Sequence, residues 1–187
     1  AGDSVIPSVH HVSIFLTTWG APVFRWEHMP RLFVAIDLPP AIRERLAALC
    51  CGLPGARWVD PEQMHLTLRF IGEVNSSVFQ LVREALTEVR SEPFTLRLEG
   101  IGFFPPRGRP RVAWTGVRKN DQLVQLRNRI ESVLVRSGLE PEGRKFSPHI
   151  TLARLNSTPG SRIGAYLVQN GMFLTEEFPV CLLYTSP

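Results

Sequence analysis

The sequence predicts an α+β fold, a bilobal and pseudo-symmetric domain in which two antiparallel sheets face a central cleft with helices on the outside. Helical patterns alternate with strands, yet several strands are joined as hairpins, which favours antiparallel over doubly wound sheets. One short pattern, His-x-Thr-Leu, occurs twice, at residues 65–68 and 149–152. Each copy is followed by a helix and further strands, which indicates a weak internal duplication of two related lobes.

The first half of the chain predicts an alternation of strands and helices. An apolar run at 32–36 predicts a strand, and Pro39-Pro40 then opens a helix whose apolar residues recur at helical spacing. A short extended stretch at 58–59 precedes the first motif strand, residues 64–71. A second helix is expected from Ser77, with Gln80 three residues later completing a capping box.

The second half begins with an expected hairpin. Residues 94–99 and 111–117 read as strands, separated by a Gly/Pro-rich turn region. Asp121 is expected to cap a third helix, which Gly138 ends. The remaining expected elements are the second motif strand at 149–155, a short helix around 163–167 and a last strand at 178–184.

Length and composition indicate one domain of an ordinary soluble protein. The 187 residues suffice for a single core shared by two lobes, and no linker composition separates them. Residues 1–28 are expected to be an extension outside a domain that spans 29–187, because a strong strand pattern follows Met29 at once. No stretch is apolar and long enough to span a bilayer. We expect a cytoplasmic monomer.

Charge and cysteine usage bear on partners and metals. The net charge is +4, and basic clusters lie at residues 107–111 and 144–145, which favours a polyanion such as RNA, although a single exposed arginine is more often merely solvated. Cys50, Cys51 and Cys181 lack metal-ligand spacing, so we expect reduced packing residues, no metal site and no cofactor.

The repeated motif carries the chemistry. His and Thr two residues apart share one face of a strand, so His65 lies beside Thr67 and His149 beside Thr151. A single strand histidine is more often structural, but residues 29–187 hold only these two, and both sit in the motif. Two imidazoles and two hydroxyls around one pocket predict acid–base chemistry on a phosphate without a metal.

Three flanking residues allow more than one role. Arg154 lies three positions beyond Thr151 and therefore faces the opposite side if the strand is regular, yet near the strand end it could contact RNA. Both a structural and an RNA-binding role stay open for it. Trp114 and Phe70 could stack on a base, although strand aromatics are more often core residues.

The motif and its surroundings resemble the two-histidine (2H) phosphoesterases, and within them the bacterial and archaeal RNA 2′,3′-cyclic phosphodiesterases, formerly called 2′-5′ RNA ligases. The resemblance spans residues 29–186 and rests on blocks at 31–36, 65–73, 102–105, 109–114, 146–154 and 183–186. Members of that family usually continue through a Gly and a Tyr into a final strand. Because this chain stops at Pro187, we expect that strand to be missing and a sheet edge to be unpaired.

The resemblance implies a metal-independent hydrolysis of RNA 2′,3′-cyclic phosphate ends to 2′-phosphomonoesters. It implies His65 as the general acid to the 3′ oxygen and His149 as the general base on water; the residues alone leave these two roles open. Thr67 and Thr151 could hold the non-bridging phosphate oxygens. Alternatives are 2′-5′ RNA ligation at the same site, a non-catalytic RNA- or nucleotide-binding module, and a structural domain with buried histidines.

Overall fold

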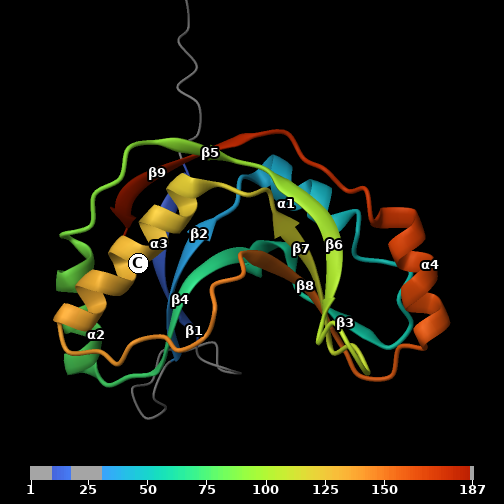
Figure 1. The fold of residues 1–187 in the computed structure, drawn as a ribbon, viewed down its shortest axis with the longest axis horizontal. Helices are drawn as coiled ribbons and strands as arrows, with labels where there is room; N and C mark the ends of the chain where they lie inside the picture. The colour runs from blue at the N-terminus through green and yellow to red at the C-terminus, as the bar shows by residue number, and fades with distance from the viewer. Residues whose placement is uncertain (1–9, 18–30, 186–187) are drawn as a thin grey trace, which may run out of the picture.

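A computed structural model describes residues 10–17 and 31–185 of the chain, and it confirms an α+β fold with mainly antiparallel sheets. The two sheets form the two limbs of an arch, and helices lie along its outer side and at its ends (Figure 1). No helix among the described residues is long and apolar enough to cross a membrane.

The first sheet has five strands and carries the first motif copy. Its order is β4 (His65–Glu73), β2 (Arg31–Asp37), β1 (His10–Thr17), β9 (Phe178–Thr185) and β5 (Phe94–Leu96). All neighbours are antiparallel except β1 and β9, which pair in parallel.

Strand β1 departs from the expected domain start. It belongs to the segment 1–28 that was expected to lie outside the domain, yet it pairs with β2 on one side and β9 on the other. The apolar residues of this stretch suit a central strand, and its pairing with β9 depends on a strand far along the chain. The expected unpaired edge is not at β2 or β9 either, since both have neighbours on each side and the outer strands are β4 and β5.

The second sheet has four strands and carries the second motif copy. Its order is β3 (Ala56–Trp58), β8 (His149–Leu155), β7 (Val112–Val117) and β6 (Leu98–Phe104), all antiparallel. The expected hairpin is present as β6 and β7, but the strand expected at 94–99 is divided. Its first part, β5, pairs with β9 in the first sheet, and the chain then crosses to β6 in the second.

Four α-helices and one short 3-10 helix complete the fold. They are α1 (Pro40–Ala47), η1 (Pro61–Gln63), α2 (Ser76–Leu86), α3 (Asp121–Arg136) and α4 (Gly160–Asn170). The caps expected at Ser77 and Asp121 are wrong by residue: Asn75 accepts from the Val78 N–H at 2.9 Å, and Asn120 accepts from the Leu123 N–H at 2.8 Å. Asparagine caps as well as Ser or Asp, and each of these two residues has the non-helical backbone a cap requires.

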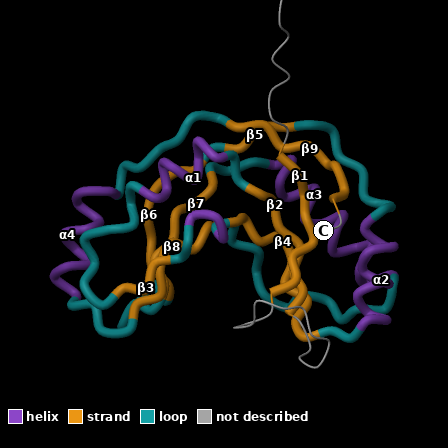
Figure 2. Tube along the Cα trace, turned by 180° about the vertical axis from the view of Figure 1, so that it is seen from behind, coloured by secondary structure: helices purple, strands orange, loops and turns teal. Residues whose placement is uncertain are grey.

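One core joins the two motif strands. Leu66 and Leu68 of β4 share it with Ile150 and Leu152 of β8, together with the inner faces of α2 and α3. A smaller cluster around Tyr166 of α4 lies under the outer part of the second sheet. Seen from behind, α2 and α3 flank the limb that holds β4, while α4 flanks the limb that holds β3 (Figure 2). The apolar sides of both motifs are therefore fixed by one core, which leaves the His and Thr sides turned away from it.

Candidate active site

Both motif strands contain a β-bulge at the same place. On β4, Thr67 lies opposite Ala35 and Arg69 opposite Val34, so Leu68 has no counterpart on β2. On β8, Thr151 lies opposite Trp114 and Ala153 opposite Ala113, so Leu152 has none on β7. The bulged residue is the leucine of His-x-Thr-Leu in each copy. The internal duplication thus extends to backbone geometry.

The bulge on β8 changes the face on which Arg154 lies. Leu152 and Ala153 are both buried, whereas Arg154 is exposed. Its partner Val112 lies on the same side of β7 as Trp114, which is opposite Thr151. Arg154 therefore shares the face of His149 and Thr151, and the opposite orientation expected for a regular strand is wrong because a bulge shifts the alternation by one residue.

The bulge on β4 does the same for Phe70. Leu68 and Arg69 are buried, and Phe70 is 48% exposed. Its partner on β2 is Phe33, whose ring stacks on the imidazole of His65. Phe70 thus occupies in the first copy the place that Arg154 occupies in the second. One motif carries an exposed aromatic there and the other a guanidinium.

The two histidines are held by matching hydrogen bonds. Nδ1 of His65 lies 2.7 Å from the carbonyl oxygen of Gln63, and Nδ1 of His149 lies 2.7 Å from that of Ser147. A carbonyl can only accept, so each Nδ1 carries a hydrogen in the neutral as well as the charged ring. This leaves Nε2 of each ring as the atom that exchanges protons with a substrate.

Aromatic rings fix the orientation of each imidazole. His65 stacks on Phe33, with 4.6 Å between ring centroids and 24° between planes. His149 meets the edge of Phe104 at 4.9 Å and of Trp114 at 6.1 Å. Trp114 in turn covers Gly102, where a Cβ would lie 2.2 Å from its ring, so only glycine allows this packing. The indole of Trp114 therefore packs against both Gly102 and His149.

Each threonine hydroxyl is available to a ligand. Thr67 and Thr151 are partly buried, and neither hydroxyl hydrogen-bonds to another residue in the part of the chain that the structure describes. Strands β4 and β8 contact one another where the two sheets meet (Figure 1). That the two imidazoles and two hydroxyls surround a single phosphate stays a prediction.

Comparison with known proteins places the chain in a family. The sequence matches the LigT like phosphoesterase family over residues 36–114 and 116–180. The chain belongs to this family. An RNA 2′,3′-cyclic phosphodiesterase of Archaeoglobus fulgidus is 38% identical over 67% of this chain and 72% of its own length. One of Escherichia coli K12 is 39% identical over 66% and 71%, respectively.

Two solved structures share the fold. Escherichia coli LigT complexed with 3′-AMP superposes with a TM-score of 0.60 at 36% identity, covering 70% of this chain and 79% of that chain. TT0787 of Thermus thermophilus superposes with a TM-score of 0.64 at 29% identity, covering 80% and 84%. The expected relation to the 2H phosphoesterases is confirmed.

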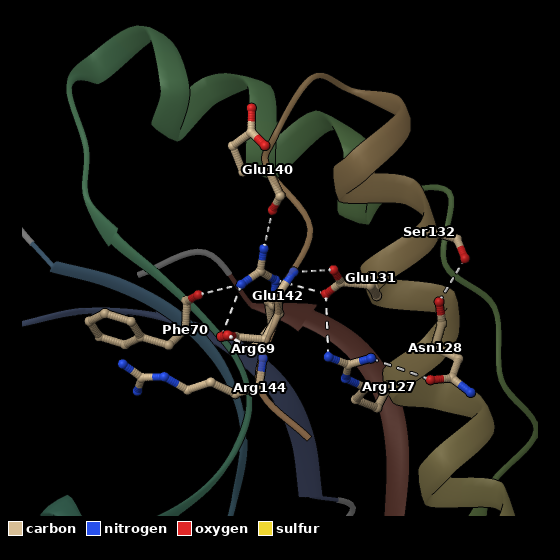
Figure 3. A network of polar contacts seen from close by, with 9 residues as sticks. All are labelled: Arg69, Phe70, Arg127, Asn128, Glu131, Ser132, Glu140, Glu142 and Arg144. Carbon is tan, nitrogen blue, oxygen red and sulfur yellow. Dashed lines mark hydrogen bonds and ion pairs between the residues drawn. The ribbon is translucent and has the colours of Figure 1, made fainter. Parts of the chain in front are cut away.

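In this LigT like phosphoesterase, a buried ion-pair network connects the first motif strand to α3 and to the segment before the second motif. The guanidinium of Arg69, only 8% exposed, lies 2.8 Å from Glu131 of α3 and 3.2 Å from Glu142. It also donates to the backbone carbonyls of Phe70 and Glu140 (Figure 3). One buried arginine thereby ties the first motif strand to the segment 139–148, which runs directly into the second motif.

The pKa of the His65 imidazole differs from that of an exposed histidine. Burial lowers the pKa of its imidazole below the usual 6.5, and the guanidinium of Arg43 lowers it further. The hydrogen bond to Gln63 and the carboxylate of Asp37 act in the opposite direction without overcoming burial. At neutral pH the free protein therefore holds His65 in its neutral form.

We expect His65 to release its proton at a lower pH in the folded than in the unfolded protein. Its contribution to stability is then complete above about pH 6.5 and is lost as the pH falls through the lowered pKa, because the unfolded chain binds that proton more readily. An NMR titration of the imidazole carbon-bound protons measures this, with His65→Gln for assignment and the urea-unfolded chain as reference. A folded midpoint at or above the unfolded one would contradict it.

Among the residues described, no three His, Cys, Asp or Glu side chains are grouped so that they could hold a metal ion. Cys50 is a partly buried free thiol, and Cys51 is free but exposed, so the packing role expected for it is not seen. The side chain of Cys181 lies outside the described part.

Sequence reasoning missed two kinds of site residue. The rings of Phe33 and Phe104 touch the histidines, but in the sequence they are ordinary strand aromatics. The carbonyls of Gln63 and Ser147 orient the imidazoles through backbone atoms, which no residue type marks. The sequence could have indicated Gln63 and Ser147 only by position, since each lies two residues before a motif histidine.

Proposed function

We propose that this chain hydrolyses RNA ends that carry a 2′,3′-cyclic phosphate, yielding 2′-phosphomonoesters by two-histidine acid–base catalysis without a metal. The observation that carries the proposal is the matched pair of histidines. Each has Nδ1 bound to a carbonyl two residues back and a threonine hydroxyl beside it on the same strand face. Curated relatives that bear the name RNA 2′,3′-cyclic phosphodiesterase support the substrate class.

In the proposed reaction, Nε2 of His149 accepts a proton from water as the water oxygen bonds to phosphorus. The bond from phosphorus to the 3′ oxygen breaks, and Nε2 of His65 donates its proton to that leaving oxygen. The hydroxyls of Thr67 and Thr151 donate to the non-bridging oxygens, whose negative charge grows in the transition state. Exchange with solvent afterwards returns each histidine to its starting state.

The low pKa of His65 fits this role once substrate is bound. A general acid must carry a proton, whereas burial keeps His65 neutral in the free protein. An anionic phosphate beside Nε2 favours the imidazolium and so opposes the effect of burial. Substrate binding thus favours the protonated form of His65, which can then donate its proton to the leaving 3′ oxygen.

The test is incubation of an RNA oligonucleotide ending in a 2′,3′-cyclic phosphate with the protein and EDTA, with the product isomers separated. We expect the 2′-phosphate alone, at a rate that added divalent metal leaves unchanged. A parallel reaction includes an RNA with a free 5′-hydroxyl. If ligation were the activity, this hydroxyl would attack the phosphorus in place of water, the 3′ oxygen would leave, and a 2′-5′ linkage would form. Absence of any turnover by the folded protein would overturn the proposal and favour a binding module.

A further inference from the structure

An arginine of α1 lies between two carboxylates close to the first motif. Nη2 of Arg43 is 3.5 Å from Oδ1 of Asp37, and Nη1 is 2.6 Å from Oε2 of Glu62. The side chain of Arg43 is only 18% exposed. Its neighbour Ile42 is buried in the core, which fixes the position of α1. One guanidinium thus connects β2, α1 and η1.

Both partners of Arg43 lead to the histidine of the first motif. Asp37 lies directly opposite His65 in the pairing of β2 with β4, so the two side chains share one face of the sheet. Glu62 immediately precedes Gln63, whose carbonyl oxygen lies 2.7 Å from Nδ1 of His65. Arg43 therefore holds both the strand partner of His65 and the residue next to the acceptor of its imidazole.

The turn that contains Glu62 and Gln63 is a small rigid unit. Oδ1 of Asp60 accepts from the Glu62 N–H at 3.0 Å, and the carbonyl of Asp60 accepts from the Gln63 N–H at 2.8 Å. Met64, which follows, is buried. The side chain of Glu62 is 77% exposed, so its ion pair with Arg43 adds little stability. What the ion pair supplies is the placement of the turn, and with it the Gln63 carbonyl.

The surroundings of Arg43 distinguish it from an arginine that binds substrate. Its guanidinium faces two carboxylates, so the three side chains together carry a net negative charge and do not attract a phosphate. The same charges act on His65. Burial is the main cause of the lowered pKa of its imidazole, while the carboxylate of Asp37 raises this pKa and the guanidinium of Arg43 lowers it.

We propose that Arg43 is a positioning residue for His65. By binding Glu62 it fixes the turn whose Gln63 carbonyl orients the imidazole. By binding Asp37 it offsets the negative charge that lies opposite the imidazole on β2. The inference rests on the proposed function and deepens it, because it adds a residue that acts on the proposed general acid without touching the substrate.

The second motif has a comparable arrangement, which supports the inference. Arg69 binds Glu142 at 3.2 Å, and this glutamate lies in the segment that ends at Ser147. The carbonyl of Ser147 accepts from Nδ1 of His149. In each half of the chain, an arginine from another element therefore ties down the segment that supplies the acceptor for the histidine.

The first test compares turnover by variants of two arginines of α1. For Arg43→Gln we expect kcat on an RNA ending in a 2′,3′-cyclic phosphate to fall about 10- to 100-fold, the cost of a small displacement of a reacting group. KM should stay unchanged, since Arg43 does not contact the substrate. Arg45→Gln is the matched control: it removes an arginine that pairs with Glu176 at 3.0 Å on the same helix, away from His65.

The second test measures the titration of His65 by NMR and by the pH dependence of kcat/KM. The charged groups that face it are Asp37 from β2, Arg43 from α1 and Glu62 from η1. In Arg43→Gln the pKa of His65 should rise, because the cation is lost and Asp37 remains. The limb of the pH profile that His65 contributes should move to higher pH with it. A residue that only stabilised the fold would not move this limb.

Two further variants separate the charge of Arg43 from its bridging contacts. Arg43→Lys keeps the cation but lacks the planar fork that reaches both carboxylates, so kcat should recover only in part while the pKa of His65 returns toward that of the unaltered protein. Glu62→Ala loses the contact with the turn and keeps the pair with Asp37. It should lower kcat severalfold and leave the pKa of His65 unchanged.

Several outcomes would overturn the inference. These are an unchanged kcat in Arg43→Gln, a rise in KM alone, which would place Arg43 at the substrate, and a lowered melting temperature without any change in the titration of His65. If the unaltered protein did not hydrolyse cyclic-phosphate RNA, the proposed function would fail instead. The NMR titration would then decide: a raised pKa of His65 in Arg43→Gln but not in Arg45→Gln supports the action of Arg43 on the imidazole, and equal pKa values refute it.

Discussion

Replacing either His65 or His149 with glutamine is expected to lower kcat on a cyclic-phosphate RNA end by about 10²–10⁴-fold, the range typical of a lost general acid or base. Glutamine keeps a polar group of similar reach but cannot exchange a proton near neutral pH. KM should change far less than kcat, because the threonine hydroxyls that we propose to hold the phosphate are unchanged in these variants. Single-turnover kinetics on folded variants measure the chemical step directly.

The double variant separates a cooperating pair from two independent groups. When two residues act in one proton-transfer step, removing both costs little more than removing one. We also expect each single variant to lose one limb of the bell-shaped pH dependence of kcat/KM. Folding is checked by thermal unfolding, since a purely structural histidine would lower the melting temperature without this kinetic pattern. Near-normal turnover by both single variants would refute the two-histidine mechanism.

The side-chain chemistry of the site could be predicted from the sequence because it depends only on local spacing. His and Thr two residues apart lie on one face of a strand regardless of what the strand pairs with, and the apolar Leu66 and Ile150 fall on the other. The apolar stripe of α3, which includes Leu126 and Ile130, follows equally local helical spacing and is buried.

Features that depend on pairing partners could not be predicted in the same way. The bulges at Leu68 and Leu152 arise from register with β2 and β7, and neither leucine differs in type from an ordinary strand residue. This is why Arg154 does not lie on the face that a regular strand would give it. The place of strand β1 and the division of β5 from β6 likewise depend on which strands pair in each sheet. A local stretch of sequence does not contain that information.

Replacing Arg69 with alanine is expected to lower the free energy of unfolding by about 3–5 kcal/mol, the cost of breaking a buried ion pair by removing one partner. Its loss leaves Glu131 and Glu142, which are 16% and 23% exposed, without the guanidinium that both contact. The carbonyl of Glu140 loses a donor as well. Denaturant unfolding measures the change, and it is a large fraction of the stability of a typical domain.

Arg136 offers a matched control for this effect. It pairs with Glu88 at 2.9 Å, but both side chains are 64% exposed. Because water screens such a pair, Arg136→Ala should cost no more than about 1 kcal/mol. Equal losses for the Arg69 and Arg136 variants would show that burial of the Arg69 network contributes nothing.

Arg69 should also influence catalysis without touching the substrate. Its partners Glu140 and Glu142 lie in the segment whose end, Ser147, supplies the carbonyl that orients His149. If this segment loosens, Nδ1 of His149 loses its fixed acceptor, and the ring is no longer held with Nε2 toward the reacting face. Glu142→Gln, which removes one ion pair and keeps the fold, is therefore expected to lower kcat several-fold while leaving KM unchanged. A rise in KM alone would instead indicate that the network shapes the binding surface, since a displaced His149 slows the chemical step.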